Sequence, residues 1–153
     1  MSPKGRNRVF LKTLNREGDM KKVLIVEDEK SVQHRWRTAL EKEGVTVVSA
    51  FHFKEAEHAF LAHLDLDAII LDGRIPPTKR ALERDDDSAF TSSLVREWRK
   101  TFNGPILAAS SSDHINESLI KAGCSHSCKK SAWGDGQVSG MVPRIILDLL
   151  AKK

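Results

Sequence analysis

The sequence predicts a doubly wound α/β fold, in which helices cover both faces of a parallel five-stranded sheet. From Lys22 onward, short apolar runs alternate with segments whose apolar residues recur at helical spacing. Several of the runs are continuously apolar, as expected for strands buried on both faces. The five predicted strands are residues 23–26, 45–50, 68–71, 106–109 and 124–129. The fifth rests on its place in the alternation alone, because only its two cysteines are apolar.

Each predicted strand is followed by a predicted helix, since apolar residues then recur three and four positions apart. The apolar faces are Val32, Trp36, Ala39 and Leu40; Phe53, Ala56, Phe60 and Leu64; Phe90, Leu94, Val95, Trp98 and Phe102; Ile115, Leu119 and Ile120; and Ile145, Ile146, Leu149 and Leu150. Gly44 and Gly123 supply C-terminal stops, and Ser112 or Asp113 supplies an N-cap. Pro143 fits the last helix only in its first turn.

Length and charge indicate one folded domain behind a basic leader. A chain of 153 residues with 40% apolar residues can bury a core and falls in the size range of a single domain. Residues 1–19 hold five basic and two acidic residues, which is +3 of the net charge of +4 and leaves +1 for the remainder. That near-neutral remainder argues against a broad nucleic-acid-binding face. We expect residues 1–20 to be a basic, disordered leader and residues 21–153 to be the domain.

The sequence supports neither a membrane span nor a secretory signal, because no run of about 18 apolar residues exists and no apolar segment follows the basic amino terminus. The expected location is the cytoplasm. Cys124 and Cys128 flank His126, but no second half-site for a metal follows them. We interpret both cysteines as reduced, partly buried thiols rather than as metal ligands or a redox pair.

Polar residues follow four of the predicted strands at the point where each strand ends. They are Glu27 and Asp28, Asp72, Ser110, and Lys130. In an open parallel sheet these ends meet at one edge, where ligands bind. Converging carboxylates repel each other, and a bound divalent cation removes that cost. Mg²⁺ is the favoured ion, with Mn²⁺ as the alternative, and a carboxylate beside it can act as a nucleophile toward phosphorus.

The same residues lie in segments that resemble the receiver domain of bacterial two-component response regulators, the group that includes the single-domain chemotaxis regulators. The matching segments are Val23–Glu29, Ile69–Asp72 with Pro76, Pro105–Ser110, and Ala122–Gly123 with Lys130. The resemblance runs from about Lys21 to the C-terminus. It implies a flavodoxin-like (βα)5 fold with the strand order 2-1-3-4-5 and five helices.

The resemblance also implies a role for each acidic residue at the sheet edge. Asp72 matches the phosphoacceptor and is a ligand of the metal. Asp28 matches a magnesium ligand, and Glu27 is expected to act through a water molecule. The backbone carbonyl of Arg74 falls where the family supplies another metal ligand.

Four further residues are assigned on the same basis. Ser110 matches the hydroxyl that moves toward the phosphoryl group, and Lys130 matches the lysine that pairs with it. Arg74 and Ser112 are expected to modulate the reaction, and Arg74 in particular to tune the lifetime of the phosphorylated form.

The chain departs from the family pattern at several positions. Ser127 stands where a switching aromatic residue is usual, so coupled rotation of an aromatic ring is not expected. Ser131 stands where the family has proline, so the usual cis peptide bond is not expected there. The loop at 77–89 is longer than usual and lacks its glycine-containing turn. We interpret its charged stretch, 78–88, as a solvated loop rather than a calcium site.

The leading functional hypothesis is a stand-alone receiver that accepts a phosphoryl group from a histidine kinase or phosphotransfer protein and signals through an unknown partner protein. It is not a classical enzyme, but at most a self-phosphorylating and autodephosphorylating receiver. We expect no attached DNA-binding domain, and phosphorylation-dependent dimerisation is one route of output.

Two other classes of function compete with this hypothesis. One is a pseudo-receiver that acts as a protein-interaction module without phosphorylation, which the two serines at 127 and 131 favour. The other is a magnesium-dependent phosphohydrolase with an Asp nucleophile. The phosphohydrolase is disfavoured because Arg74 occupies the position where such enzymes place a second Asp.

Overall fold

The computed structural model describes residues 20–78, 89–130 and 140–152. Five strands in these ranges form one parallel sheet in the order β2-β1-β3-β4-β5. The strands are β1 (Lys22–Val26), β2 (Thr46–Ala50), β3 (Ala68–Leu71), β4 (Ile106–Ala108) and β5 (His126–Ser127). The predicted fold class and strand order are therefore confirmed. The predicted leader up to residue 19, the charged segment 79–88 and Ser131 lie outside the described residues.

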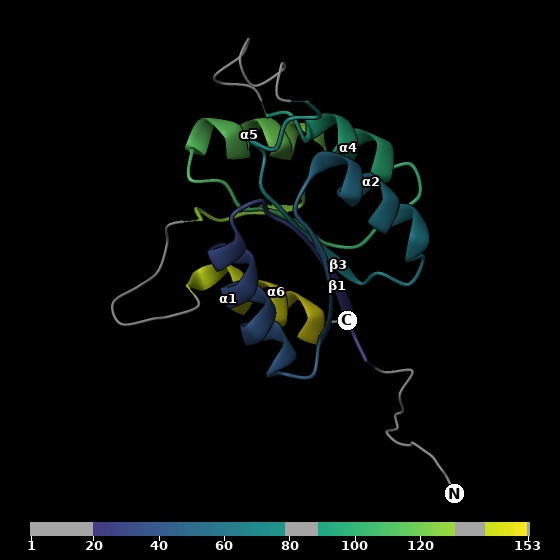
Figure 1. The fold of residues 1–153 in the computed structure, drawn as a ribbon, viewed down its shortest axis with the longest axis vertical. Coiled ribbons are helices and arrows are strands. Elements are labelled where there is room, and N and C mark those ends of the chain that lie inside the picture. Colours follow the sequence, from purple (N-terminus) through teal and green to yellow (C-terminus); the bar gives the residue numbers. More distant parts are fainter. Residues whose placement is uncertain (1–19, 79–88, 131–139, 153) are drawn as a thin grey trace, which may run out of the picture.

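Helices cover both faces of the sheet, so the fold has three layers (Figure 1). The described helices are α1 (Lys30–Glu41), α2 (Phe53–Ala62), α4 (Ser92–Trp98), α5 (Asp113–Ala122) and α6 (Met141–Ala151). α1 and α6 lie on one face, and α2, α4 and α5 lie on the other. No helix among the described residues is long and apolar enough to cross a bilayer.

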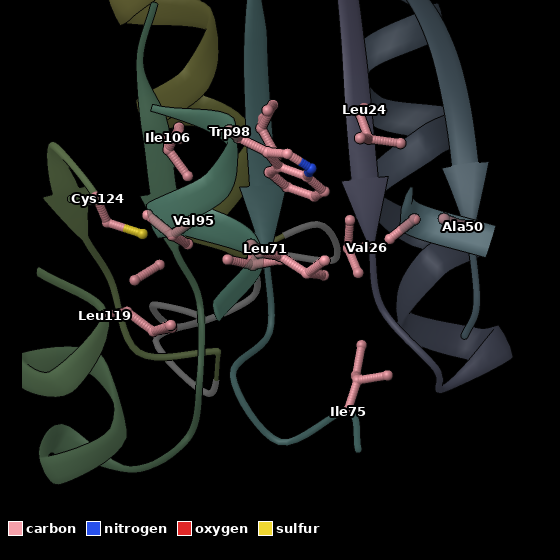
Figure 2. Packing of buried hydrophobic residues seen from close by; sticks show 14 of the residues in the cluster. Leu24, Val26, Ala50, Leu71, Ile75, Val95, Trp98, Ile106, Leu119 and Cys124 are labelled. Atoms are coloured by element: carbon pink, nitrogen blue, oxygen red, sulfur yellow. The ribbon is translucent and has the colours of Figure 1, made fainter. Parts of the chain in front are cut away.

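Each face of the sheet has its own apolar core, because successive residues of a strand point to opposite sides. Leu24 and Val26 of β1 pack with α2, α4 and α5, whereas Val23 and Ile25 pack with α1 and α6. Figure 2 shows the first of these cores, in which Trp98 lies over the sheet. Burial on both faces explains why β3, β4 and the part of β1 after Lys22 consist of uninterrupted apolar residues.

Several local predictions are confirmed by the described residues. The Ser112 hydroxyl accepts a hydrogen bond from the Ile115 N–H at 3.3 Å, which makes Ser112 the N-cap of α5. Pro143 is the third residue of α6 and so lies in its first turn. Cys124 is buried, Cys128 is half-buried, and both are free thiols.

The predicted bounds of β5 and of the third predicted helix are wrong. β5 contains two residues rather than 124–129. The flanking Ser125 and Cys128 N–H groups still donate to the Ile106 and Ala108 carbonyls, so main-chain contact with β4 extends beyond the strand. α4 covers 92–98 rather than 90–102. Phe102 belongs to the turn that follows α4, and it packs edge-on against Phe60 at 6.2 Å between ring centroids.

Gly73 allows α5 to pack directly against the turn that follows β3. A Cβ atom at this position would overlap the Ile115 side chain and would lie 3.0 Å from Leu119 Cδ1. Both neighbours are buried and belong to the apolar core on that face. The helix that follows β4 is therefore in contact with the residue next to Asp72.

Gly73→Ala is expected to lower the free energy of unfolding by about 1–3 kcal/mol, because it overfills this contact. Urea denaturation measures the change. The double variant Gly73→Ala/Ile115→Leu should recover part of the loss, since leucine has no methyl group on Cβ, and Ile115→Leu alone is the control. A full loss in the double variant would contradict the proposed overlap.

Candidate functional site

The carboxyl ends of β1, β3, β4 and β5 bring the predicted site residues to one edge of the sheet. Between β1 and β3 the strand order reverses, since β2 pairs with the other side of β1. Ligands of open parallel sheets bind in the crevice at such a reversal. Glu27 follows β1 and Asp72 follows β3, and the Asp72 N–H donates to the Val26 carbonyl at 3.0 Å. Strand pairing therefore fixes the two acids side by side.

Three carboxyl groups form an acidic cluster. Glu27, Asp28 and Asp72 each offer an oxygen within 4.8 Å of the others. Glu27 is fully buried and Asp72 is 4% exposed, whereas Asp28 is exposed. The cluster is thus open to solvent on the Asp28 side and closed beneath Glu27.

Lys130 is the cation that balances this cluster. Its Nζ donates to Asp72 Oδ2 at 2.7 Å and to Glu27 Oε2 at 3.2 Å. The same ammonium lies 3.6 Å from Glu29 Oε1, and its side chain is 14% exposed. The Lys130 N–H donates to the Ser110 carbonyl at 3.0 Å, so main-chain pairing beyond β5 sets the position of the lysine.

Burial and like charge raise the pKa of Glu27. Burial is the largest cause, the neighbouring Asp72 adds to it, and Lys130 only partly opposes them, so the pKa rises from 4.5 to about 8. Burial lowers the pKa of Lys130, but the attraction of Asp72 and Glu27 outweighs burial, so that pKa is raised. The lysine is charged at neutral pH, but it does not offset the burial of Glu27 together with the charge of Asp72.

The donor set fits a small divalent cation. Glu27 Oε1 is buried without a hydrogen-bond partner among the described residues, although Lys130 Nζ lies 3.0 Å away as an ion pair. Hard cations prefer oxygen ligands, and Mg²⁺ is commonly held by one or two carboxylates together with water. An ion beside Asp28 would relieve the repulsion that raises the pKa of Glu27. The carbonyl of Arg74 as a ligand stays a prediction.

A second group of predicted residues lines a pocket next to the acidic cluster. The pocket has a volume of about 310 Å³ and is lined by Asp72, Arg74, Ser110, Ser111, Ser112, Ile115 and Lys130. The Ser110 hydroxyl accepts a hydrogen bond from the Ser112 N–H at 3.2 Å. Hydroxyl and cationic groups therefore share one cavity with Asp72, which suits an anionic group.

Arg74 is one of the residues that line this pocket. Its N–H donates to Asp72 Oδ1 at 3.1 Å, and its guanidinium stacks on the Phe90 ring, 5.0 Å from the centroid. The two carboxylate oxygens of Asp72 thus have different partners, Arg74 N–H on Oδ1 and Lys130 on Oδ2.

Three buried polar residues near the site are absent from the sequence predictions. Gln33, Thr91 and Asn116 each hydrogen-bond to the main chain of a site residue. The available signal was a polar residue next to buried apolar positions, as Gln33 follows Val32 and Asn116 follows Ile115. A single polar residue on an apolar helix face is common, so this signal is weak by itself.

Comparison with known proteins identifies the fold. A two-component response regulator from Clostridium difficile aligns with a TM-score of 0.67 and 15% sequence identity, over 88% of this chain and 98% of its own. The receiver domain of the Francisella response regulator 1452 gives a TM-score of 0.63 and 21% identity, over 86% and 98%. Vibrio cholerae chemotaxis protein CheY4 gives a TM-score of 0.62 and 21% sequence identity, over 87% of this chain and 98% of its own.

No protein-family model matches the chain. The structural comparisons nevertheless agree with one another, and each covers 86–88% of the chain. The chain therefore has the fold of a response regulator receiver domain, as the resemblance in the sequence predicts.

In the absence of divalent cations, the free energy of unfolding should fall as the pH rises from about 4.5 to about 8. Folded Glu27 keeps its proton up to a pKa of about 8, whereas unfolded Glu27 releases it near 4.5. Between these values the folded state binds more protons, so stability falls with pH. Lys130 adds no slope in this window, since its pKa is raised from 10.5.

Urea denaturation in EDTA at several pH values tests this expectation, with Glu27→Gln as the variant that should flatten the slope. Glu97→Gln removes an exposed acid paired only with Lys100 and serves as the control. An unchanged slope in Glu27→Gln would show that the acidic cluster is not its source.

Proposed function

We propose that this protein is a receiver that accepts a phosphoryl group on Asp72 from a histidine kinase or phosphotransfer protein. The observation that carries the proposal is the double contact of Lys130 with Asp72 and Glu27, next to an acidic cluster open to solvent at Asp28. In the receiver fold, this combination places a nucleophile, a fixed cation and a metal-binding face at one sheet edge. The cytoplasm is the compartment in which we expect it to act.

In the proposed reaction, a carboxylate oxygen of Asp72 attacks the phosphorus atom of the donor. The bond between phosphorus and the donor atom breaks, and its electron pair leaves with the imidazole of the histidine or with the acetate of a small donor. The product is an acyl phosphate on Asp72. The Lys130 ammonium, already 2.7 Å from Oδ2, is placed to follow the negative charge onto the phosphoryl oxygens.

The metal would be held by Asp28 and Asp72, with Glu27 behind them. When bound, Mg²⁺ or Mn²⁺ neutralises charge on the phosphoryl oxygens and lowers the repulsion that an incoming anion meets. The hydroxyl of Ser110 lines the same pocket and can donate to a phosphoryl oxygen there. Since Ser110 begins the connection from β4 to α5, a change at this hydroxyl is passed to the helix that contacts Gly73.

A change in the face made by α5 and β5 would then recruit a partner protein, because local charge biases a surface with two arrangements. Ser127 is exposed on β5 and offers no aromatic ring. Output would therefore depend on the β4–α5 connection rather than on rotation of a ring. Dimerisation of the phosphorylated form remains one route of output.

A phosphorylation-independent pseudo-receiver is the second candidate. The observation that favours it is Ser127, which is exposed on β5 and brings no aromatic ring to the position where receivers usually carry a switching one. A protein without that switch would use the same fold as a constitutive interaction surface.

Incubation with Mg²⁺ and acetyl phosphate should add about 80 Da to the intact mass, the increment of one phosphoryl group. The adduct should be labile to base and absent in Asp72→Asn, which removes the nucleophile but keeps the shape of the side chain. Lys130→Met should slow its formation by about 100-fold, since it removes the charge that stabilises the transferring group. Wild-type protein that gains no mass and binds no Mg²⁺ would favour the pseudo-receiver.

Arg74→Ala should shorten the lifetime of the phosphorylated form by about threefold or more, a barrier change of roughly 0.7 kcal/mol. The Arg74 side chain lines the pocket and would shield the phosphoryl group from water, and alanine removes that shield. Loss of the adduct with time, followed by mass spectrometry, measures the rate. Arg74→Lys keeps the charge and is the control. Equal lifetimes in Arg74→Ala and the wild type would remove Arg74 from the modulating residues.

A further inference from the structure

The buried polar side chains of the described residues fall into two sets of three. Glu27, Asp72 and Ser110 are the site residues discussed above. The remaining buried polar residues are Gln33, Thr91 and Asn116. Each comes from the start or the first turns of a helix that follows a strand: Gln33 from α1, Thr91 from the N-cap of α4, and Asn116 from α5.

Each member of the second set holds the main chain of one member of the first. The Gln33 amide nitrogen lies 3.2 Å from the carbonyl oxygen of Glu27 and contacts those of Ile25 and Ala50 at the same distance. The Thr91 hydroxyl donates to the Asp72 carbonyl at 3.0 Å.

Asn116 holds both main-chain groups of Ser110. Its Oδ1 accepts from the Ser110 N–H at 2.9 Å, and its Nδ2 donates to the Ser110 carbonyl at 3.2 Å. A longer contact of 3.5 Å runs from Nδ2 to the Cys128 carbonyl, two residues before Lys130. Because the Ser110 carbonyl also accepts from the Lys130 N–H, Asn116 connects the segments that carry the hydroxyl and the lysine.

The physical need for these contacts arises where the strands end. Past Val26 and Leu71 the N–H groups of Glu27 and Asp72 still donate to a neighbouring strand, whereas their carbonyls contact the Gln33 and Thr91 side chains. Two residues past Ala108, the Ser110 N–H donates to the Asn116 side chain. Buried main-chain groups require hydrogen bonds, and a side chain that supplies them also fixes where the residue lies. A site whose atoms must be placed to within about 0.5 Å depends on such support.

We infer that Gln33, Thr91 and Asn116 are positioning residues, each assigned to one element of the site. Gln33 fixes the position of Glu27 and therefore the metal-binding face. Asn116 fixes the positions of Ser110 and Lys130 and therefore the phosphoryl-binding face. Thr91 fixes the position of Asp72, which belongs to both faces. The assignment rests on the proposed function for its phosphoryl part, whereas its metal part is measured by binding of the metal alone.

The test compares two quantities in Gln33→Met, Thr91→Val and Asn116→Ala. One is the Mg²⁺ dissociation constant, measured by calorimetry without a phosphodonor. The other is the maximal rate of adduct formation at saturating Mg²⁺. Removal of groups that orient metal ligands costs about 10–100-fold in affinity or activity. Gln33→Met should weaken Mg²⁺ binding by about tenfold with a near-normal maximal rate, and Asn116→Ala should do the reverse.

Thr91→Val should lower both quantities, and Thr91→Ser, which restores the hydroxyl, should recover both. Thr91→Val replaces one hydroxyl with a methyl group of similar size, so it keeps the test usable if an amide variant fails to fold. Ser125→Ala is the matched control. The Ser125 hydroxyl holds the N–H and carbonyl of Ile106 at 3.0 and 3.3 Å, at the opposite end of β4.

If these residues had a purely structural role, all variants, including Ser125→Ala, would have a lower melting temperature. No variant would then change the Mg²⁺ dissociation constant without also changing the maximal rate of adduct formation. A Gln33→Met or Asn116→Ala variant that changes both quantities together, or a Thr91→Val variant that matches Ser125→Ala, would overturn the inference. If the wild type binds Mg²⁺ but forms no adduct, the proposed function fails. The split in Mg²⁺ affinity between Gln33→Met and Asn116→Ala then still decides the metal part of the inference.

Discussion

Repulsion between carboxyl groups at the ends of β1 and β3 is the constraint on which the rest of this structure depends. Parallel pairing of two fully buried strands brings Glu27 and Asp72 together, and neither side chain can turn to solvent. The Lys130 ammonium, which follows the edge strand β5, offsets part of the repulsion. Burial, more than the neighbouring Asp72, raises the pKa of Glu27. A cation bound at this edge would favour the charged form of both acids.

Much of this arrangement could be predicted from the sequence because strand ends are marked by an abrupt change of polarity. The run Val23–Val26 stops at two acids, and Ile69–Leu71 stops at Asp72, so both the strands and the edge they share were identifiable. The strand order was implied by the resemblance to receiver domains, and pairing of the described strands confirms it. Ser112 as a helix N-cap followed from its residue type and position alone.

Other features could not be predicted, because they depend on contacts between distant segments. β5 contains two exposed residues, and no local apolar pattern marks where it begins or ends. Gln33 and Asn116 interrupt apolar helix faces, yet only the fold reveals that each faces the end of a strand. The close approach of α5 to Gly73 likewise becomes visible only in the fold, because Gly73 and Ile115 lie far apart in the sequence.

The shortness of β5 has a consequence for how the domain opens. Two residues pair with β4, and the flanking Ser125 and Cys128 N–H groups each donate one further bond to that strand. Lys130 is held by its ion pairs and by one main-chain bond to Ser110. Detachment of this edge therefore removes the counter-charge from Glu27 and Asp72, and loss of that counter-charge favours detachment. Local unfolding of the edge and the ionic state of the pocket are one linked equilibrium. An ion bound in the pocket would raise the free energy of opening of this edge, which hydrogen exchange measures. By reciprocity, opening of the edge would weaken ion binding by the same free energy.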